Sequence, residues 1–201
     1  MPTTKQKIGC IILAAGDSTR MNSEAKQLLE FRGKTLLRRA AETAIEANFD
    51  RIVIVLGSIA EELKKEIDDL PVQIAVNKNW ETGMSSSIKV GLSAFSNGEN
   101  IDAVVVTLCD QPLVSAKILR ELGETFAETG KSIIACRYAE TIGVPALFAR
   151  VVFDDLMDLR EDEGAKKVIK KYEAETAVIL APEAAFDVDT AQDYEKLKII
   201  L

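Results

Sequence analysis

The sequence predicts an α/β sandwich built as a single domain around a mostly parallel sheet. Apolar runs of strand length alternate with segments of helical period from the start of the chain, which is the pattern of successive βα units. The strand-like runs are nearly continuous in valine and isoleucine, so helices are expected to cover both faces of the sheet. The chain of 201 residues, 47 % hydrophobic, is long enough for one substantial core.

The predicted elements follow from these periods. Five runs are expected to be strands, at residues 8–14, 51–56, 72–76, 103–108 and 132–136. Apolar residues recur at helical spacing over 36–45 and 118–126. A further strand at 143–148, helices at 151–159 and 165–172, a short strand at 176–180 and a last helix through Tyr194 and Leu197 complete the pattern. Ligands of such a sheet bind beyond the carboxyl ends of the strands.

The charge pattern argues against polyanionic partners. The chain has 25 basic and 32 acidic residues, a net charge of −7, with the acids spread along its length. This surface repels phosphate polymers, so neither nucleic acid nor an anionic membrane is an expected partner. The chain begins with a polar segment, and no apolar run approaches the ~18 residues of a membrane span, so a cytoplasmic protein is expected.

The residue inventory limits the chemistry. The sequence contains no histidine, which excludes Ser-His and Cys-His nucleophiles, histidine-ligated zinc and imidazole bases. Cys10, Cys109 and Cys136 stand singly in or beside apolar runs, which predicts buried, reduced thiols. The available groups are carboxylates, lysine, arginine, hydroxyls and a bound hard cation.

The first candidate site follows the first predicted strand. A strand that opens into small residues and a glycine exposes backbone N–H groups to an approaching anion. Arg20 and Lys26 add two positive charges there, a combination that suits a triphosphate. The alternative is a surface loop with incidental charges. The residues whose backbone would form the anion-binding turn are Leu13, Ala14, Ala15 and Gly16.

The second candidate is Asp110, two residues after the predicted strand 103–108. An acid at the end of a buried strand is held at the carboxyl edge of the sheet, where a hard cation can reach it. Its alternative role is to cap the helix that begins near Ser115, although Asp110 lies five residues too early for a cap.

The third candidate is the pair Asp187 and Asp189. If the segment is extended, alternate residues point to one side, so both carboxylates would face one ion. The alternative is that Asp189 or Thr190 caps the last helix.

The segment from Asn77 to Ser87 contains a glycine followed by hydroxyls at a predicted helix start. Gly83, Ser85 and Ser87 offer backbone and side-chain donors for a ribose, a base edge or a phosphate. Trp80, the one tryptophan, lies in the same segment, where packing of a loop onto the core is at least as good an explanation as binding.

Taken together, these segments resemble the molybdenum cofactor cytidylyltransferase group of the MobA-like NTP transferases, within the wider family of cofactor and sugar nucleotidyltransferases. The resemblance spans residues 11–197. The matching pieces, in order, are L-A-A-G-D-S-T-R-M followed by K-Q-L-L, then G-K-T-L-L, N-K-N-W-E-T-G-M-S-S-S-I, L-C-D-Q-P, G-V-P-A-L-F and F-D-V-D-T-A-Q-D-Y.

The resemblance implies a Rossmann-like, three-layer α/β/α sandwich of the nucleotide-diphospho-sugar transferase type. It also implies binding of CTP with Mg²⁺, or Mn²⁺ in its place, and transfer of CMP to the phosphate of a molybdopterin cofactor, with a molybdoenzyme as a further partner. Carried over by position, Gly16, Arg20 and Lys26 would hold the triphosphate, and Asp110 would bind the metal together with Asp187 and Asp189. Asn77, Gly83, Ser85 and Ser87 would complete the nucleotide site.

Base choice and acceptor rest on fewer residues. Relatives that transfer guanylyl groups usually carry L-A-G-G where this chain has Ala14-Ala15-Gly16, which favours CTP. The G-H-P of many cytidylyl relatives is Gly143-Val144-Pro145 here, and their G-D-x-G-A-R is E-D-E-G-A-K at 161–166. Both departures lie in the half that should meet the acceptor. The rivals are a guanylyltransferase, a cytidylyltransferase for another phosphorylated acceptor, a non-catalytic cofactor carrier and a flavodoxin-like electron carrier.

Overall fold

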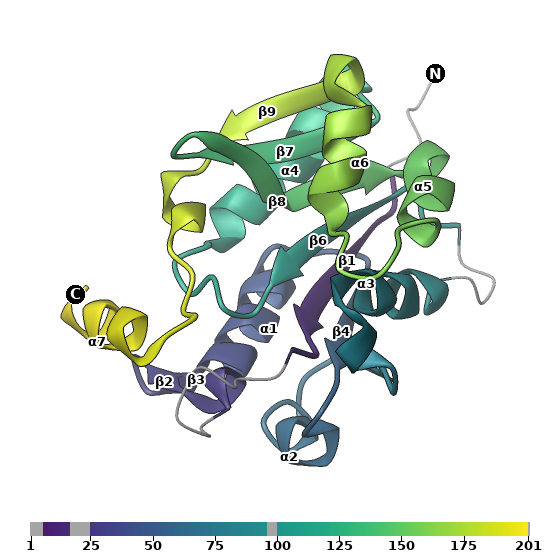
Figure 1. Ribbon diagram of the computed structural model, residues 1–201. Helices are drawn as coiled ribbons and strands as arrows, with labels where there is room; N and C mark the ends of the chain where they lie inside the picture. The colour runs from purple at the N-terminus through teal and green to yellow at the C-terminus, as the bar shows by residue number, and fades with distance from the viewer. Residues whose placement is uncertain (1–5, 17–24, 96–99, 201) are drawn as a thin grey trace.

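Seven strands form one sheet, in the order β5-β4-β1-β6-β8-β7-β9 (Figure 1). The structure is a computed structural model that describes residues 6–16, 25–95 and 100–200. The strands are β1 (Ile8–Ala14), β4 (Arg51–Leu56), β5 (Gln73–Val76), β6 (Ala103–Leu108), β7 (Ile133–Tyr138), β8 (Thr141–Ala149) and β9 (Thr176–Leu180). Each strand predicted from the sequence is present at its expected place.

Most neighbouring strands run parallel, as predicted. The exception is β8, which is antiparallel to both β6 and β7. Strands β7 and β8 form a hairpin that extends beyond the predicted strands 132–136 and 143–148. The residues added at the tip of the hairpin are exposed, as Arg137 is, or half-buried, as Tyr138, Thr141 and Ile142 are, so the apolar runs alone did not mark them.

Helices cover both faces of the sheet, which explains the continuous apolar content of its central strands. One face packs against α1 (Leu36–Glu46), α2 (Ala60–Lys64) and α4 (Ala116–Thr129). The other face packs against α3 (Met84–Ser93), α5 (Phe153–Met157) and α6 (Ala165–Lys171). Alternate residues of β1 divide between the two cores, with Ile12 in the first and Ile11 in the second. The three-layer α/β/α sandwich is therefore confirmed.

Short elements complete the chain. The predicted helix 151–159 is a 3-10 turn, η3 (Arg150–Val152), followed by α5. The small strands β2 (Glu30–Phe31) and β3 (Lys34–Thr35) pair with each other. A third apolar cluster joins this hairpin to the last helix, α7 (Ala191–Ile199), so that the two lie side by side (Figure 1). The remaining 3-10 turns are η1 (Lys26–Leu28), η2 (Trp80–Thr82), η4 (Glu173–Glu175) and η5 (Pro182–Ala185).

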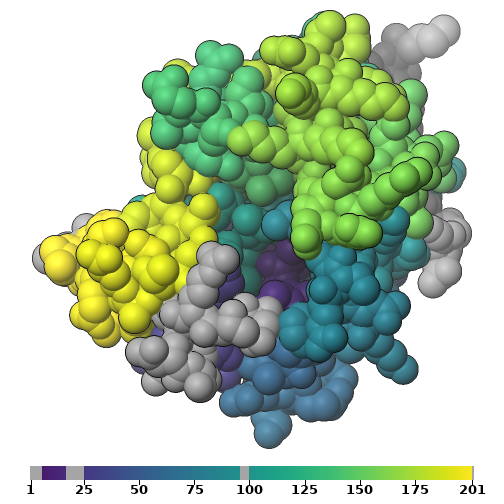
Figure 2. Space-filling view, viewed as in Figure 1, coloured from purple at the N-terminus to yellow at the C-terminus, as the bar shows by residue number. Residues whose placement is uncertain are grey.

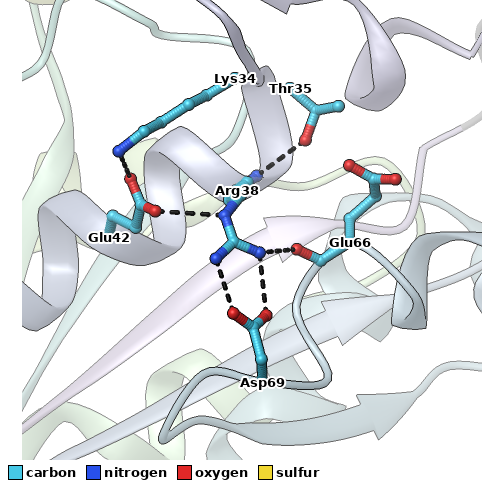
Figure 3. Close-up of polar contacts among 6 residues, drawn as sticks. All are labelled: Lys34, Thr35, Arg38, Glu42, Glu66 and Asp69. Atoms are coloured by element: carbon cyan, nitrogen blue, oxygen red, sulfur yellow. Dashed lines mark hydrogen bonds and ion pairs between the residues drawn. The ribbon is translucent and has the colours of Figure 1, made fainter.

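A polar network fixes the start of α1 to the turn after α2. Thr35 caps α1 by accepting a hydrogen bond from the amide of Arg38, at 3.2 Å. The Arg38 guanidinium donates to both carboxylate oxygens of Asp69 and to the carbonyl of Glu66, at 2.7–2.8 Å (Figure 3). It also donates to Glu42 one turn along the helix, at 3.2 Å. A planar guanidinium suits this fork-like pairing, which orients α1 beside the β4–β5 connection.

The three cysteines are buried and free, as the sequence predicts. Burial raises the pKa of the Cys109 thiol to about 12, so it is protonated at neutral pH. Within the described residues, no helix has the length and apolar character that crossing a bilayer requires.

Candidate functional site

The candidate site lies where the chain reverses its direction of travel across the sheet. From β1 the chain passes to β4 and β5 on one side, and it then returns through α3 to β6 on the other side of β1. Such a switch point opens a crevice beyond the carboxyl ends of the two central strands. Gly16 lies two residues after β1, and Asp110 lies two residues after β6. The backbone joins these ends, since the Cys109 amide donates to the Leu13 carbonyl at 3.3 Å.

A pocket of about 320 Å³ occupies this crevice. The surface is hollowed there, with residues of the N-terminal strand region at the floor, in purple, between the α3 and α6 regions (Figure 2). The volume is at the small end of the range for small-molecule sites, ~300–1,000 Å³. The pocket is lined by Leu13, Ala14, Ala15, Gly16, Lys26, Gln27, Trp80, Glu81, Gly83, Met84, Ser87, Leu108, Cys109 and Asp110.

The backbone of residues 13–16 forms the floor. The methyl groups of Ala14 and Ala15 point into the two opposite cores, so these residues present mainly backbone to the pocket. Ala15 also runs close to Gly57, where an added Cβ would lie 2.1 Å from the Ala15 carbonyl oxygen. Glycine at position 57 therefore permits the path of the floor.

Gln27 holds the floor from one side. Its side-chain amide is buried and donates to the carbonyls of Ala14, at 3.1 Å, and Gly16, at 2.7 Å. The K-Q-L-L pattern contains this residue but predicts no role for it. No local pattern distinguishes a glutamine that reaches back to the preceding strand from one that is exposed to solvent.

Lys26 joins two of the predicted metal ligands. Its ammonium group makes a short hydrogen bond to Asp110 Oδ2 and a second hydrogen bond, of 3.0 Å, to Asp189 Oδ1. Burial alone would lower the pKa of Lys26, but the charge of Asp110 and the hydrogen bonds to both acids raise it above its ordinary value. The ammonium is therefore charged and neutralises carboxylates from the middle and the end of the chain.

Asp187 lies in the same group of charges. Burial raises the pKa of Asp187 to about 6, and the negative charges of Asp110 and Asp189 act in the same direction. The two acids flank Val188, which is fully buried and donates its amide to the Asp110 carbonyl at 2.9 Å. Residues 186–189 are irregular and do not form a strand, so the alternation considered for Asp187 and Asp189 does not apply, and Val188 is the anchor that brings the acids to Asp110.

Neither predicted acid is used as a helix cap. Ser115 caps α4, since its hydroxyl accepts from the Ile118 amide at 3.4 Å. Thr190 caps α7 in a reciprocal capping box with Asp193. The capping alternatives considered for Asp110 and Asp189 are therefore excluded.

The donor set fits a hard divalent cation, with Lys26 beside it. Asp110 Oδ1 is buried and has no hydrogen-bond partner among residues 6–16, 25–95 and 100–200, which leaves one carboxylate oxygen available to a ligand. Among the described residues, no three acidic, histidine or cysteine side chains stand close enough together to form a ready-made metal site. Mg²⁺ does not require one, because it is commonly held by one or two carboxylates, substrate phosphates and water.

The other predicted residues divide into two groups. Gly83 and Ser87 line the pocket, while Asn77 and Ser85 do not. The Asn77 amide group donates to the hydroxyls of Ser86, at 2.7 Å, and Ser87, at 3.0 Å, so it braces the turn. Ser85 donates its hydroxyl to the carbonyl of Glu161 at 2.6 Å. Arg20, expected to hold the triphosphate, lies outside the described residues.

Met84 and Glu81 also line the pocket, and neither belongs to the site expected from the sequence. Met84 begins α3 and is partly exposed beside Trp80, which packs against the core while also lining the pocket. Trp80 therefore packs a loop onto the core and also contributes to the pocket, so each of the two explanations considered for it, packing and binding, describes part of its environment. Glu81, in the same turn, adds an acid to this wall.

Comparison with known proteins supplies the family. A model for the MobA-like NTP transferase domain matches residues 10–176. The chain is 37 % identical over 112 residues to the nicotine blue oxidoreductase of Paenarthrobacter nicotinovorans, covering 56 % of this chain and 53 % of that protein. It is 31 % identical over 166 residues to the bifunctional protein GlmU of Corynebacterium aurimucosum, covering 79 % of this chain and 32 % of GlmU. The chain thus spans about half or less of these curated relatives.

Solved structures resemble nearly the whole chain. The crystal structure of Rv0371c from Mycobacterium tuberculosis H37Rv has a TM-score of 0.84 and 29 % identity, covering 98 % of this chain and 100 % of that one. A second structure of Rv0371c, in complex with manganese, has a TM-score of 0.80 with the same coverage.

Proposed function

The chain belongs to the family of MobA-like NTP transferase domains, and we propose that it is a cytidylyltransferase that requires Mg²⁺ or Mn²⁺. In this proposal it transfers CMP from CTP to the phosphate of a molybdopterin cofactor and releases pyrophosphate. A molybdoenzyme would then receive the product. The match to the family model and the residue pattern quoted above support the reaction class, while the base and the acceptor rest on the sequence resemblance.

One observation carries the proposal. A lysine and two aspartates from three distant parts of the chain meet at a backbone-lined pocket at the switch point of the sheet. This arrangement combines a cation for phosphate oxygens, carboxylates for a hard metal and free space beside backbone groups. Neither a carrier nor a flavodoxin-like electron carrier requires that combination.

The mechanism follows from the available groups. The acceptor phosphate is largely dianionic near neutral pH, so an oxygen of it can attack the α-phosphorus of CTP without a strong base. The new P–O bond forms as the bond to the β-phosphate breaks, and pyrophosphate leaves with the electron pair. Lys26 would hold a phosphate oxygen as a point charge, and the backbone of 13–16 would receive the triphosphate. Arg20 would add a fork onto two phosphate oxygens.

Asp110 and Asp189, with Asp187 beside them, are the residues proposed to hold the metal. A bound Mg²⁺ or Mn²⁺ would neutralise the charge that gathers on the leaving pyrophosphate. The unpartnered Oδ1 of Asp110 supports this role, as does the manganese bound by the structural relative Rv0371c. Lys26 would exchange one of its carboxylate partners for phosphate when nucleotide and metal enter.

The test is a screen of nucleotides and acceptors. CTP and GTP are each supplied with molybdopterin, isoprenoid phosphate or sugar phosphate acceptors, with and without Mg²⁺, and pyrophosphate release is measured. We expect release with CTP, molybdopterin and Mg²⁺, and a loss of about 10² or more in kcat in the Asp110→Asn protein. More efficient use of GTP would reverse the base assignment, and preference for another acceptor would reverse the substrate assignment.

A second candidate function comes from the relative named as an oxidoreductase, whose identity to this chain is 37 % over 112 residues. An oxidoreductase would consume a redox cofactor such as NADH in the presence of an oxidised substrate. The same screen includes an arm with NADH and nicotine blue, followed by the absorbance of both. Turnover in that arm without pyrophosphate release in the others would favour this candidate and refute the proposal.

A further inference from the structure

The turn at residues 160–163 is joined to the start of α3 through a single carbonyl group. The Glu161 carbonyl accepts hydrogen bonds from the Ser85 hydroxyl, at 2.6 Å, and from the Ser85 amide, at 3.3 Å. Ser85 is 4 % exposed, so these bonds are shielded from water. They also supply a partner for the start of α3, where Gly83 stands at the cap position with no side chain to offer.

The turn behaves as one unit, so this contact sets its position. The Arg160 amide donates to the Glu163 carboxylate at 2.8 Å, and the Glu163 amide donates to the Arg160 carbonyl at 2.8 Å. Glu163 also pairs with Lys167 in the first turn of α6, at 2.5 Å. A turn that is closed internally moves as a whole, and its hydrogen bonds to Ser85 decide where it stands relative to α3.

The packing around the contact leaves no room for adjustment. A Cβ on Gly83 would lie 2.5 Å from Asp162 Oδ1 and 2.6 Å from the Glu161 carbonyl oxygen. A Cβ on Gly164 would lie 3.1 Å from the sulfur of Met84. Glu161 itself has a φ of 43°, in the left-handed region that disfavours a side chain. A residue keeps such a conformation where its surroundings enforce it. Here the hydrogen bonds from Ser85 to the Glu161 carbonyl hold Glu161 in place.

The position of the turn at residues 160–163, next to the pocket, suggests a role in binding the second substrate. The pocket of about 320 Å³ beside Asp110 is at the small end of the range for a single small-molecule site, whereas a transfer reaction brings two substrates together. The turn adjoins the Gly83–Met84 wall of this pocket, since a Cβ on Gly83 would meet Glu161 and Asp162. A separate hollow of about 480 Å³ is lined by Arg160, Glu161, Asp162 and Glu163, and it offers the second substrate a place beside the first.

We propose that Ser85 is a positioning residue. Through the Glu161 carbonyl it holds residues 160–164 as the wall against which the phosphorylated acceptor binds, and it does not contact the nucleotide. This inference rests on the proposed transferase function for the identity of the second substrate. The geometry of the clamp, defined as Ser85 with the Glu161 carbonyl, does not depend on that function.

The experiment compares Ser85→Ala with a neighbouring serine. Amide hydrogen exchange is measured by mass spectrometry over residues 84–88 and 158–165 of the full chain. In Ser85→Ala we expect exchange in both segments to rise by about fivefold, the scale of one net hydrogen bond. Ser86→Ala is the matched control, because the Ser86 hydroxyl bonds only within residues 77–86 in the described structure, and exchange over 158–165 should not change.

Kinetics separate positioning from general loss of structure. With molybdopterin and CTP, Ser85→Ala should raise the KM for the acceptor about fivefold, while the KM for CTP stays within about twofold of the parent. Ser85→Thr, which retains the hydroxyl, should restore the exchange rate and the acceptor KM. An increase in the KM for CTP alone, or unchanged exchange over 158–165, would overturn the inference.

The two proposals fail differently. If the parent protein releases no pyrophosphate with any acceptor, the proposed function is refuted and the acceptor wall with it, while faster exchange in Ser85→Ala still upholds the clamp. If the parent turns over and Ser85→Ala has the parental acceptor KM, the proposed function stands and this inference is wrong.

Discussion

The charge group at the pocket provides the sharpest test of the site. Asp110→Asn replaces a carboxylate by an amide of almost the same shape, and Lys26→Met removes the ammonium but keeps a long side chain. The two changes are made singly and together, which forms a double-mutant cycle around the short hydrogen bond between the two residues. The cycle distinguishes a structural ion pair from groups that act on substrate.

The expected energies follow from the burial of the pair. The side chains of Lys26 and Asp110 are 15 % and 14 % exposed, while Asp189, the other partner of Lys26, is 53 % exposed. Exposed pairs contribute about 0–1 kcal/mol, and removing one partner of a fully buried pair costs about 3–5 kcal/mol. Because Asp189 remains, Asp110→Asn should lower the free energy of unfolding by about 1–3 kcal/mol. The double variant should lie within about 1 kcal/mol of the parent, since no buried charge is left unpaired.

Two assays measure the stability and the activity of the two single variants and the double variant. Urea unfolding at neutral pH gives the free energies, and pyrophosphate release gives the activities. We expect the double variant to regain stability yet remain about 10²-fold or more below the parent in turnover, because the groups that act on phosphate are gone. Additive effects on stability would refute the energetic coupling. Recovery of activity in the double variant would show that the pair serves the fold and not the reaction.

Three further predictions address the metal and the pocket floor. Mn²⁺ should raise the melting temperature of the parent protein. It should bind more tightly to Lys26→Met, which lacks the competing ammonium, and more weakly to Asp110→Asn. Equal Mn²⁺ affinities of the three proteins in thermal-shift titrations would contradict this prediction. Gln27→Leu removes both donors to the floor and should raise the KM for CTP about fivefold or more in steady-state kinetics, whereas an unchanged KM would exclude that support. Gly57→Ala forces a Cβ toward the Ala15 carbonyl oxygen and should cost about 1–3 kcal/mol in urea unfolding, and parental stability would disprove the steric argument.

The sequence predicted the sheet because its central strands are covered on both faces. A strand such as β1 has apolar residues at every position, since Ile11 and Ile12 belong to different cores, and this continuous run needs no tertiary information to be recognised. The β7–β8 hairpin was underestimated for the opposite reason. Its distal part, residues 137–142, is exposed or half-buried, so the apolar signal is weak there.

The sequence predicted those site residues that come directly after a strand. Asp110 was predicted because an acid that follows a buried strand necessarily lies at the carboxyl edge of the sheet. The structure places Lys26 and Asp189 beside it. Ser85 and Glu161 are 76 positions apart in the sequence, so no local pattern predicts their contact. Ser85 was therefore assigned to the nucleotide, although its hydroxyl is committed elsewhere.

The charges of the pocket are consistent with the proposal that a divalent cation binds together with the nucleotide. Within the described residues the group holds three carboxylates, Asp110, Asp187 and Asp189, and the single ammonium of Lys26. With every group ionised this leaves an excess of two negative charges, and the partial neutralisation of Asp187 relieves only part of it. A bare triphosphate approaching this group would be repelled, whereas a triphosphate that arrives with a divalent cation brings the charge that the carboxylates attract. If that cation bound Asp110 in place of Lys26, Lys26 would be available to phosphate oxygens. The Lys26–Asp110 ion pair and the proposed binding of a divalent cation would in this way be two solutions to one charge imbalance.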